Sequence, residues 1–422
     1  MGNAESVGLP GHPSASLRHF PHCLLFVSTD KPLYMIRKTT LLALLVAAAP
    51  LAAAAHDTDE THPQAAYADL DYETPGITVN INSSNPAIQQ MQPTFKFGGY
   101  IMEKYSISDR SGQATNGGFD TRFVRLYMDG KVYQDFYYKL QMEVNGQPGV
   151  DKGPRIVDAF VEWQKFDCFR VKLGQFKRSF GFENPYSPLN VGLGSYSQAT
   201  MKLASIGDRI GEHKSSGRDV GVQVQGDLFP AADGHKWLHY QIGFFNGQGI
   251  NHTDKDHHKD LIGGLWFSPV KNLAIGGFGW NGKYTNESFT NPATQLRAAK
   301  RVRWGAGLKY EDKWTVRGEY MSSVGGVTTD ATRADRSDAW YATVGVPVAP
   351  KVKVYARYDC YRDNKEWNSL VTNYGLSGNY YLSKNLIFQL NYTFTDDRTA
   401  RRAANPTDSR YNTFDVQVTA RF

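Results

Sequence analysis

The sequence predicts an all-β protein, a transmembrane antiparallel β-barrel of about 16 strands with its third external loop folded into the lumen. Three observations lead to this fold class. The last segment, from Asn412 to Phe422, alternates apolar and polar side chains with the period of a strand and ends on an aromatic ring. Many segments of similar length and pattern precede it. The connections between them alternate between short and long, as periplasmic turns and external loops do in such barrels.

The residues before the barrel carry the signs of export. Arg37 and Lys38 precede an apolar run from Leu41 to Leu51, and small residues follow up to Ala55. This order is the form of a secretory signal peptide, and the run is shorter than the about 20 residues of a spanning helix. A genuinely long leader is the alternative for the residues before Met35. We therefore expect an upstream extension from a misplaced start (1–34), a signal peptide (35–55), a loosely ordered polar periplasmic lead-in (56–93) and the barrel (94–422).

Composition and charge narrow the function classes. The formal net charge of the 422 residues is +6, and removing residues 1–55 takes away four basic and two acidic residues, which lowers it to +4. That charge suits anionic solutes but not a nucleic-acid partner. The mean hydropathy of −0.47 agrees with strands that face water on one side. Cys168 and Cys360 should lie too far apart on the predicted strands for a disulfide.

The predicted strands begin near Thr94, and most have about the 9–11 residues that a tilted strand needs to cross a bilayer. A clear example has Phe136, Tyr138 and Leu140 on one face and Lys139 on the other. The strands are residues 95–107, 119–128, 134–144, 155–164, 168–176, 218–228, 237–246, 259–267, 272–281, 301–310, 314–323, 337–346, 351–361, 370–381, 385–395 and 412–422.

The connections support a closed barrel rather than a sandwich, in which such regularity is not needed. Short turns are predicted at 129–133, 165–167, 268–271, 311–313, 347–350 and 383–384. Long loops alternate with them at 145–154, 177–217, 247–258, 282–300, 324–336 and 396–411. An even number of strands leaves both ends on the periplasmic side, and a barrel of this size leaves an aqueous channel.

The longest connection, Lys177 to Gly217, is the third external loop. It contains the aromatic residues Phe180, Phe182, Tyr186 and Tyr196, which we expect to pack against the inner wall, so that the loop narrows the channel. The alternative is an external flap over the mouth. The basic residues of this loop, candidates for anion selectivity, are Lys177, Arg178, Lys202 and Arg209.

The alternation also predicts which charges face the lumen, and basic residues exceed acidic ones. Such an excess favours the passage of anions, although each charge could simply pair across neighbouring strands. The basic set is Arg125, Lys139, Arg170, Lys172, Arg301, Arg303, Lys309, Arg317, Lys351, Lys353, Arg357 and Arg421. The acidic set is Glu143, Asp158, Glu162, Asp219, Glu319, Asp359 and Asp415.

Three stretches carry a family resemblance: Gly174–Glu183, Gly217–Leu228 and Tyr240–Asn251. In this order they resemble the phosphate-selective porin O and P family, and the likeness extends over about residues 95–422. The resemblance implies a 16-stranded, usually trimeric outer-membrane channel whose basic constriction residues bind phosphate or polyphosphate. It also assigns Lys177 to the constriction, and Ser179 stands where the family often has proline.

Together these features predict a passive outer-membrane porin with an anion bias, without a cofactor and without enzymatic activity. A general diffusion porin without phosphate selectivity is the alternative. The expected partners are small anions such as phosphate, outer-membrane lipid, two further copies in a homotrimer and, through Phe422, the barrel assembly machinery. The expected selectivity residues are Lys177, Arg178, Lys202 and Arg209 in the loop and Arg170, Lys172, Arg301 and Arg303 in the wall.

Other chemistry is less well supported by the sequence. His252, His257 and His258 share an external loop with acidic residues, but without a repeated ligand spacing we interpret them as a solvated loop tip rather than a metal site. The stretch Gly277–Lys283 fails as a phosphate-binding loop because Tyr284 replaces the required Ser or Thr. An enzyme would need a nucleophile beside a histidine such as His235 or His239, and an adhesive barrel would need larger external loops.

Overall fold

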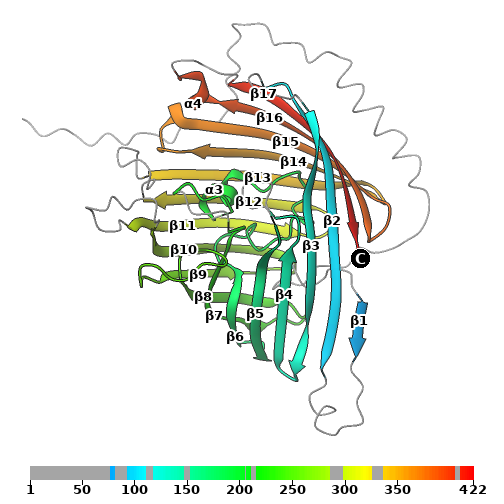
Figure 1. Ribbon diagram of the computed structural model, residues 1–422, viewed down its shortest axis with the longest axis vertical. Coiled ribbons are helices and arrows are strands. Elements are labelled where there is room, and N and C mark those ends of the chain that lie inside the picture. Colours follow the sequence, from blue (N-terminus) through cyan, green and yellow to red (C-terminus); the bar gives the residue numbers. More distant parts are fainter. Residues whose placement is uncertain are drawn as a thin grey trace, which may run out of the picture. The chain divides into compact units, whose positions relative to one another are not determined.

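The computed structural model describes residues 77–80, 93–110, 117–146, 153–204, 206–210, 215–285, 298–325, 336–403 and 409–422. Within them, strands β2 to β17 each pair antiparallel with the next, and β17 pairs with β2 (Figure 1). The result is a closed antiparallel barrel of 16 strands inside a 17-stranded sheet. The predicted extension and signal peptide (1–34 and 35–55) lie outside the described residues.

The strands of the barrel are β2 (Thr94–Ser108), β3 (Gly117–Tyr133), β4 (Phe136–Glu143), β5 (Arg155–Phe166), β6 (Phe169–Lys177), β7 (Arg218–Pro230), β8 (Lys236–Phe245), β9 (Asp260–Phe267), β10 (Leu273–Thr285), β11 (Ala298–Glu311), β12 (Thr315–Val324), β13 (Arg336–Ala349), β14 (Val352–Arg362), β15 (Leu370–Tyr381), β16 (Leu386–Asp397) and β17 (Arg410–Arg421). All sixteen predicted strands are confirmed. Within the described residues the short helices are α3 (Gln198–Leu203), η2 (Trp367–Ser369) and α4 (Arg398–Arg401).

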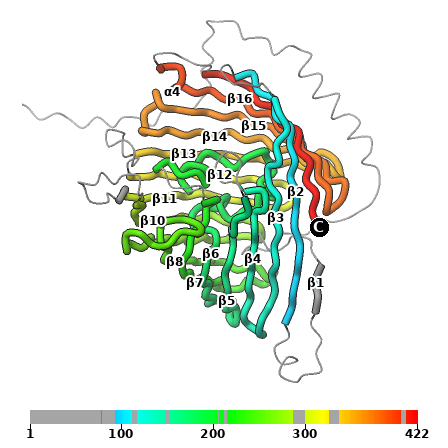
Figure 2. The backbone as a smooth tube through the Cα atoms, viewed as in Figure 1, coloured from blue at the N-terminus to red at the C-terminus, as the bar shows by residue number. Residues whose placement is uncertain are grey.

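The barrel closes where the first and last of these strands meet. Figure 2 shows the chain passing from β2 around the wall until the red carboxy-terminal strand lies beside β2 again. Gly99 and Phe422 exchange two backbone hydrogen bonds, of 2.9 and 3.0 Å, at the end of this pairing. The ring of Phe422 lies over Gly99, where a Cβ would come within 2.6 Å of it.

A short strand that the sequence did not reveal lies next to this closure. β1 (Ile77–Asn80) pairs with Thr94–Phe97 of β2, and the following part of β2, from Tyr100, pairs with β17. The prediction of a loosely ordered lead-in is therefore wrong at Ile77–Asn80. The physical reason is that β17 ends beside Gly99, and an uncovered strand edge favours pairing with another segment. Four residues are too few for alternation to predict a strand.

The two faces of the wall differ in chemistry. On β16, Gln389 and Asn391 are buried, whereas Phe388, next to Gln389, is exposed; on β6, Lys172 is buried beside exposed Leu173. One face of the strands is thus polar and buried and the other apolar and exposed, as in a barrel that faces lipid outside and polar surroundings inside. No helix among the described residues has the length and hydrophobicity to cross a bilayer.

Residues 178–217, between β6 and β7, pack against the buried face. The Phe180 ring lies 5.6 Å from Trp280, and the Phe182 ring lies 5.0 Å from Phe278, both on β10. Within this segment α3 begins after Ser197, whose hydroxyl accepts a hydrogen bond from the backbone N–H of Thr200 at 3.1 Å. Figure 1 shows α3 among β12, β13 and β14, and it contacts all three.

Candidate functional site

Lys177, the residue assigned to the constriction by resemblance, is the last residue of β6 rather than the first of the loop. Its ammonium donates to the carbonyl oxygens of Pro185, at 3.2 Å, and Tyr186. It also lies 6.0 Å from the centre of the Tyr196 ring. The loop therefore turns back on Lys177 and brings two carbonyl oxygens and one aromatic ring to its ammonium.

Two of the other predicted loop residues are buried in polar networks. The guanidinium of Arg178 donates to Asp219 Oδ2 at 2.8 Å, and both side chains are fully buried. Arg209 donates to the carbonyl oxygen of Gly325 at 2.6 Å and to that of Asp363 at 3.0 Å. Both residues therefore stabilise the position of the loop.

Lys202 differs from these residues. It lies in the last turn of α3 and is exposed. Its side chain forms no ion pair or hydrogen bond with any residue that the structure describes. Lys202 is therefore the predicted loop cation whose charge is most accessible.

The structure places a carboxylate beside each predicted wall cation. Arg170 donates to Asp227 at 2.6 Å, and Lys172 lies 3.7 Å from Glu162. The remaining wall pairs are Arg301 with Asp260 at 2.5 Å and Arg303 with Asp208 at 2.6 Å. These positive charges are largely neutralised, in agreement with the alternative that the sequence left open.

Three of the predicted residues come together around one ring. The guanidinium carbons of Arg178, Arg301 and Arg303 lie 5.1, 4.6 and 4.8 Å from the centre of the Trp280 ring. Each of the three also pairs with an aspartate, so the cluster balances its charges. Buried arrangements of this kind fix geometry and leave little net field for a solute.

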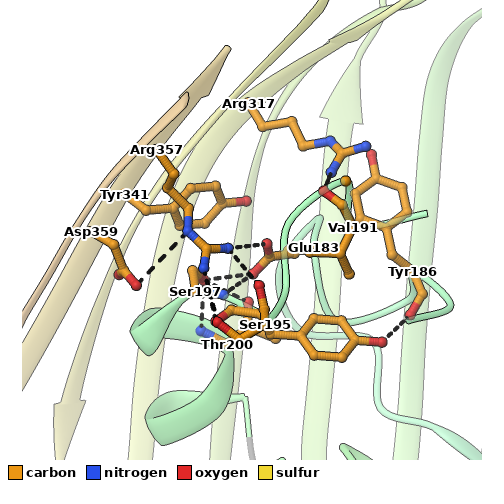
Figure 3. Close-up of polar contacts among 12 residues, drawn as sticks. Glu183, Tyr186, Val191, Ser195, Ser197, Thr200, Arg317, Tyr341, Arg357 and Asp359 are labelled. Atoms are coloured by element: carbon orange, nitrogen blue, oxygen red, sulfur yellow. Dashed lines mark hydrogen bonds and ion pairs between the residues drawn. The ribbon is translucent and has the colours of Figure 1, made fainter. Parts of the chain in front are cut away.

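A polar network on β12 to β14 holds the middle of the loop (Figure 3). Arg357 donates to the carbonyl oxygen of Ser195 at 2.9 Å and lies 3.5 Å from Glu183. Glu183 in turn accepts from the backbone N–H and the hydroxyl of Ser197, at 2.9 and 2.6 Å. Asp359 accepts from the backbone N–H of Gln198 at 3.0 Å. Wall side chains thus satisfy loop backbone groups that would otherwise be buried without partners.

Further strands hold the loop on either side of this network. Arg317 of β12 donates to the carbonyl oxygens of Val191 and Asn190, at 2.9 and 3.0 Å. Asn379 of β15 and Gln389 of β16 donate to the carbonyl oxygen of Gly192, at 2.9 and 3.1 Å. Residues 190–192 are therefore attached to three strands.

Two residues of the loop, Gly192 and Tyr186, are constrained by their surroundings. Gly192 has φ +83°, and a Cβ there would come within 2.6 Å of the Tyr355 ring, so a side chain is excluded. Burial raises the pKa of Tyr186 well above its usual value, so this phenol stays neutral. Its hydroxyl donates to Glu311 at 2.9 Å.

Two arginines of the buried face have no carboxylate within ion-pair distance among the described residues, Arg122 and Arg421. Arg122 donates to Gln417 at 2.7 Å. It is the extra residue of a bulge in β3, because Phe123 pairs with Met102 and Thr121 with Glu103. If the alternation were strict, Arg122 and Arg125 would lie on opposite faces of β3, and Arg122 would face outward. The bulge turns Arg122 to the buried face, and a single sequence does not show where a bulge lies. Arg421 was predicted to face the lumen but not to act in selectivity.

The remaining motifs give no reactive centre in the described part of the chain. No group of three or more His, Cys, Asp or Glu residues there could hold a metal ion. His239 is bonded to Asp227 at 2.6 Å and stacks on Trp266 at 3.9 Å. His235 lies 3.1 Å from a backbone carbonyl, that of Ser268. Cys168 and Cys360 are free thiols.

A closed barrel of sixteen antiparallel strands, with a polar buried face and an apolar exposed face, is the architecture of an outer-membrane porin. The model of the phosphate-selective porin O and P family matches residues 99–422, and the chain belongs to this family. It is therefore a porin of the bacterial outer membrane, and its family and fold are those of a channel rather than an enzyme. A search of curated protein sequences finds no match.

Solved porin structures share the fold at low sequence identity. The anion-selective porin from Comamonas acidovorans is 13% identical, with a TM-score of 0.56 over 78% of this chain and 100% of its own. The trimer form of OmpT from Vibrio cholerae is 14% identical, with a TM-score of 0.53 over 78% and 99%. The outer membrane channel DcaP of Acinetobacter baumannii is 11% identical, with a TM-score of 0.52 over 78% and 97%.

Proposed function

We propose that the protein is a passive, water-filled channel that prefers small anions, with phosphate or polyphosphate as the leading solutes. One observation carries the anion preference: Arg122 and Arg421 lie on the buried face without an ion-pair partner among the described residues. The family and the anion selectivity of the Comamonas acidovorans porin support it. Unpaired cations along a pore raise the local concentration of anions.

The segment 178–217 is proposed to form the constriction inside the barrel. Its aromatic rings pack on the buried face of β10, and its backbone bonds to side chains of β12, β14, β15 and β16. This attachment to the buried face of several strands supports a segment that crosses the lumen over one that covers the mouth. It would thereby set the width and the charge of the passage.

The predicted selectivity residues are proposed to divide into two roles. Lys177 at the constriction and Lys202 on α3 would act on permeating anions. The paired cations Arg170, Lys172, Arg178, Arg209, Arg301 and Arg303 would hold the loop and the wall in place.

Assembly and maturation complete the proposal. The trimer form of the OmpT structure supports a homotrimer in outer-membrane lipid, and the terminal Phe422 would engage the barrel assembly machinery. The signal peptide 35–55 would be removed after Ala55, leaving residues 56–93 before the barrel. Mass spectrometry of the protein purified from outer membranes should give a chain that begins at His56; a chain retaining residues 35–55 would contradict this.

The test is the reversal potential of the purified protein in a planar bilayer under a KCl gradient, repeated with added phosphate. Anion preference with block of the chloride current by phosphate is expected, and Lys177→Gln should relieve the block. An anion-selective current indifferent to phosphate would identify a general diffusion porin. A current without anion preference, or no current from correctly folded protein, would overturn the proposal.

A further inference from the structure

We propose that the outer rim of the barrel around η2 and α4 binds a glycolipid of the outer membrane whose headgroup carries phosphate. The surface, which we call the rim patch, consists of Tyr374, Trp367, Arg398 and Arg402. The inference does not depend on which solute the channel passes. It requires only a barrel in the bacterial outer membrane, as the family and the fold show.

The apolar part of the rim patch lies on the exposed face of the wall. Tyr374 of β15 is 48% exposed, and its ring lies 5.4 Å from that of Tyr358 on β14. Leu376, the next residue on the same face of β15, is 46% exposed. Apolar side chains on the outer face of such a barrel meet the acyl chains of the lipid.

Trp367 lies one step nearer the end of the barrel. Its ring packs edge-on against Trp340 of β13, with a distance of 6.3 Å between the ring centres. Val344 shares the face of Trp340 on β13 and is 41% exposed, so both tryptophans lie on the lipid-facing side. Trp367 itself is 51% exposed. Tryptophan is enriched where a membrane meets water, at the level of the headgroups.

An ion pair on the wall supports Trp367. The guanidinium carbon of Arg362 on β14 lies 4.7 Å from the centre of the Trp367 ring and 5.5 Å from that of Trp340. Arg362 also donates to the two carboxylate oxygens of Asp338, at 2.8 and 2.6 Å. Because Asp338 neutralises its charge, Arg362 supports the patch and is not its phosphate ligand.

The cations of the rim patch come from α4, in the connection between β16 and β17 (Figure 1). Arg398 donates to the backbone carbonyl oxygen of Trp367 at 3.4 Å. Arg402 follows four residues later as the C-cap, so the two side chains leave the same side of the turn. Both are exposed, and neither has a carboxylate within ion-pair distance among the described residues.

The described carboxylates near the patch are engaged elsewhere. Asp396 pairs with Arg401. Asp397 accepts from a backbone N–H of α4 at 2.9 Å, and Glu366 accepts from the side-chain amide of Asn368 at 2.9 Å. The two arginines of the rim patch therefore keep most of their donors for an external anion.

The order of these groups along the wall matches a lipid. Leu376, Tyr374, Trp367 and α4 follow one another toward the end of the barrel opposite Phe422. Acyl chains, sugar and phosphate follow one another in the same direction in a phosphorylated glycolipid. Arginine binds phosphate through parallel N–H donors, and each basic residue near an anionic lipid surface strengthens binding about fivefold. Free phosphate would use the arginines alone.

The experiment measures, by native mass spectrometry, how diphosphoryl lipid A and its dephosphorylated form bind to the full-length protein in detergent. The phosphorylated lipid is expected to bind about thirtyfold more tightly, the effect of two arginines. Arg398→Gln with Arg402→Gln should abolish that difference. Arg398→Lys with Arg402→Lys keeps the charge and should lose less. An equal concentration of inorganic phosphate should not displace the lipid.

The matched control is Lys255→Gln with Lys259→Gln, two lysines that are also four residues apart, in the loop between β8 and β9. It should leave lipid binding unchanged. Equal binding of the two lipids to the wild type would overturn the inference, as would displacement by inorganic phosphate or an equal loss in the lysine and arginine variants. Trp367→Ala should weaken both lipids alike, and an unchanged affinity would overturn the assignment to the rim patch.

Discussion

Arginines of the buried face have different partners in two regions of the barrel wall. On strands β6 to β14, which we call the loop-bound wall, the described arginines of the buried face each have a carboxylate within ion-pair distance, as Arg303 has Asp208 at 2.6 Å. On β17, β2 and β3, the seam wall, Arg122 and Arg421 lack such a partner. Arg125, on the same strand as Arg122, has one in Glu143.

The difference indicates two roles for arginine side chains in this barrel. On the loop-bound wall, arginines hold residues 178–217 and the charges cancel. On the seam wall, Arg122 and Arg421 lack such partners among the described residues, and the proposed function assigns their charges to the attraction of anions. A count of lumen-facing cations in the sequence therefore overestimates the net positive charge of the loop-bound wall, because carboxylates neutralise those cations. The count also does not show which cations are unpaired.

The largest expected effect comes from breaking a buried pair of the loop-bound wall. Asp219→Ala removes the partner of Arg178 and an acceptor of the backbone N–H of Gly247, at 2.8 Å. An uncompensated buried charge should lower the free energy of unfolding by about 3–5 kcal/mol. Urea unfolding in detergent micelles measures it. Asp415→Asn is the control, because among the described residues Asp415 accepts a side-chain hydrogen bond only from Ser106; an equal loss for both would contradict the comparison.

The next effect comes from freeing the middle of the loop. Arg357→Gln removes bonds to Ser195 and Tyr196 and the contact with Glu183. Hydrogen bonds to a charged group contribute about 1.5–3 kcal/mol. We expect faster proteolysis within residues 178–217 and a noisier single-channel current. A variant as quiet and as resistant as the wild type would show that Arg357 does not hold the loop.

A smaller effect is expected from a single methyl group. Gly192→Ala forces a left-handed residue, at about 1–2 kcal/mol, against the Tyr355 ring, so the loop should shift and the conductance change. Gly234→Ala is matched, because Gly234 also has a positive φ, +87°, but no described atom lies within 4 Å of its Cβ position. Equal conductance changes in the two variants would remove the link between Gly192 and the passage.

The smallest effect is expected at Lys202. It is exposed, so solvent and salt screen its charge over about 8 Å at physiological ionic strength. Lys202→Gln should lower the anion preference slightly at 0.01 M salt and leave it nearly unchanged at 1 M. A large change that persists at high salt would place Lys202 in a desolvated part of the passage.

The sequence predicts the barrel well because its signals are local. Strand alternation and the lengths of connections such as 268–271 and 177–217 are present in the chain itself, whereas the predicted turn 129–133 belongs to β3 and the chain turns at residues 134–135. β1 was missed because it is short and forms only where β17 leaves an edge of β2 uncovered.

The site was less predictable, because it depends on contacts between distant residues. Whether Arg303 is neutralised depends on Asp208, which a loop brings to it across 95 positions. The inward direction of Arg122 depends on a bulge. The correct part of the prediction was the packing of Phe180 and Phe182 against the wall, since large aromatic side chains in a long loop need apolar partners.

The most direct test of this account is the reversal potential of two double variants under the same KCl gradient. The first double variant, Arg122→Gln with Arg421→Gln, removes the unpaired arginine charges of the seam wall. The second, Arg170→Gln with Asp227→Asn, removes an ion pair of the loop-bound wall. We predict that the first variant loses most of its preference for chloride and that the second keeps the wild-type value. The reverse result, or equal losses in both, would contradict it.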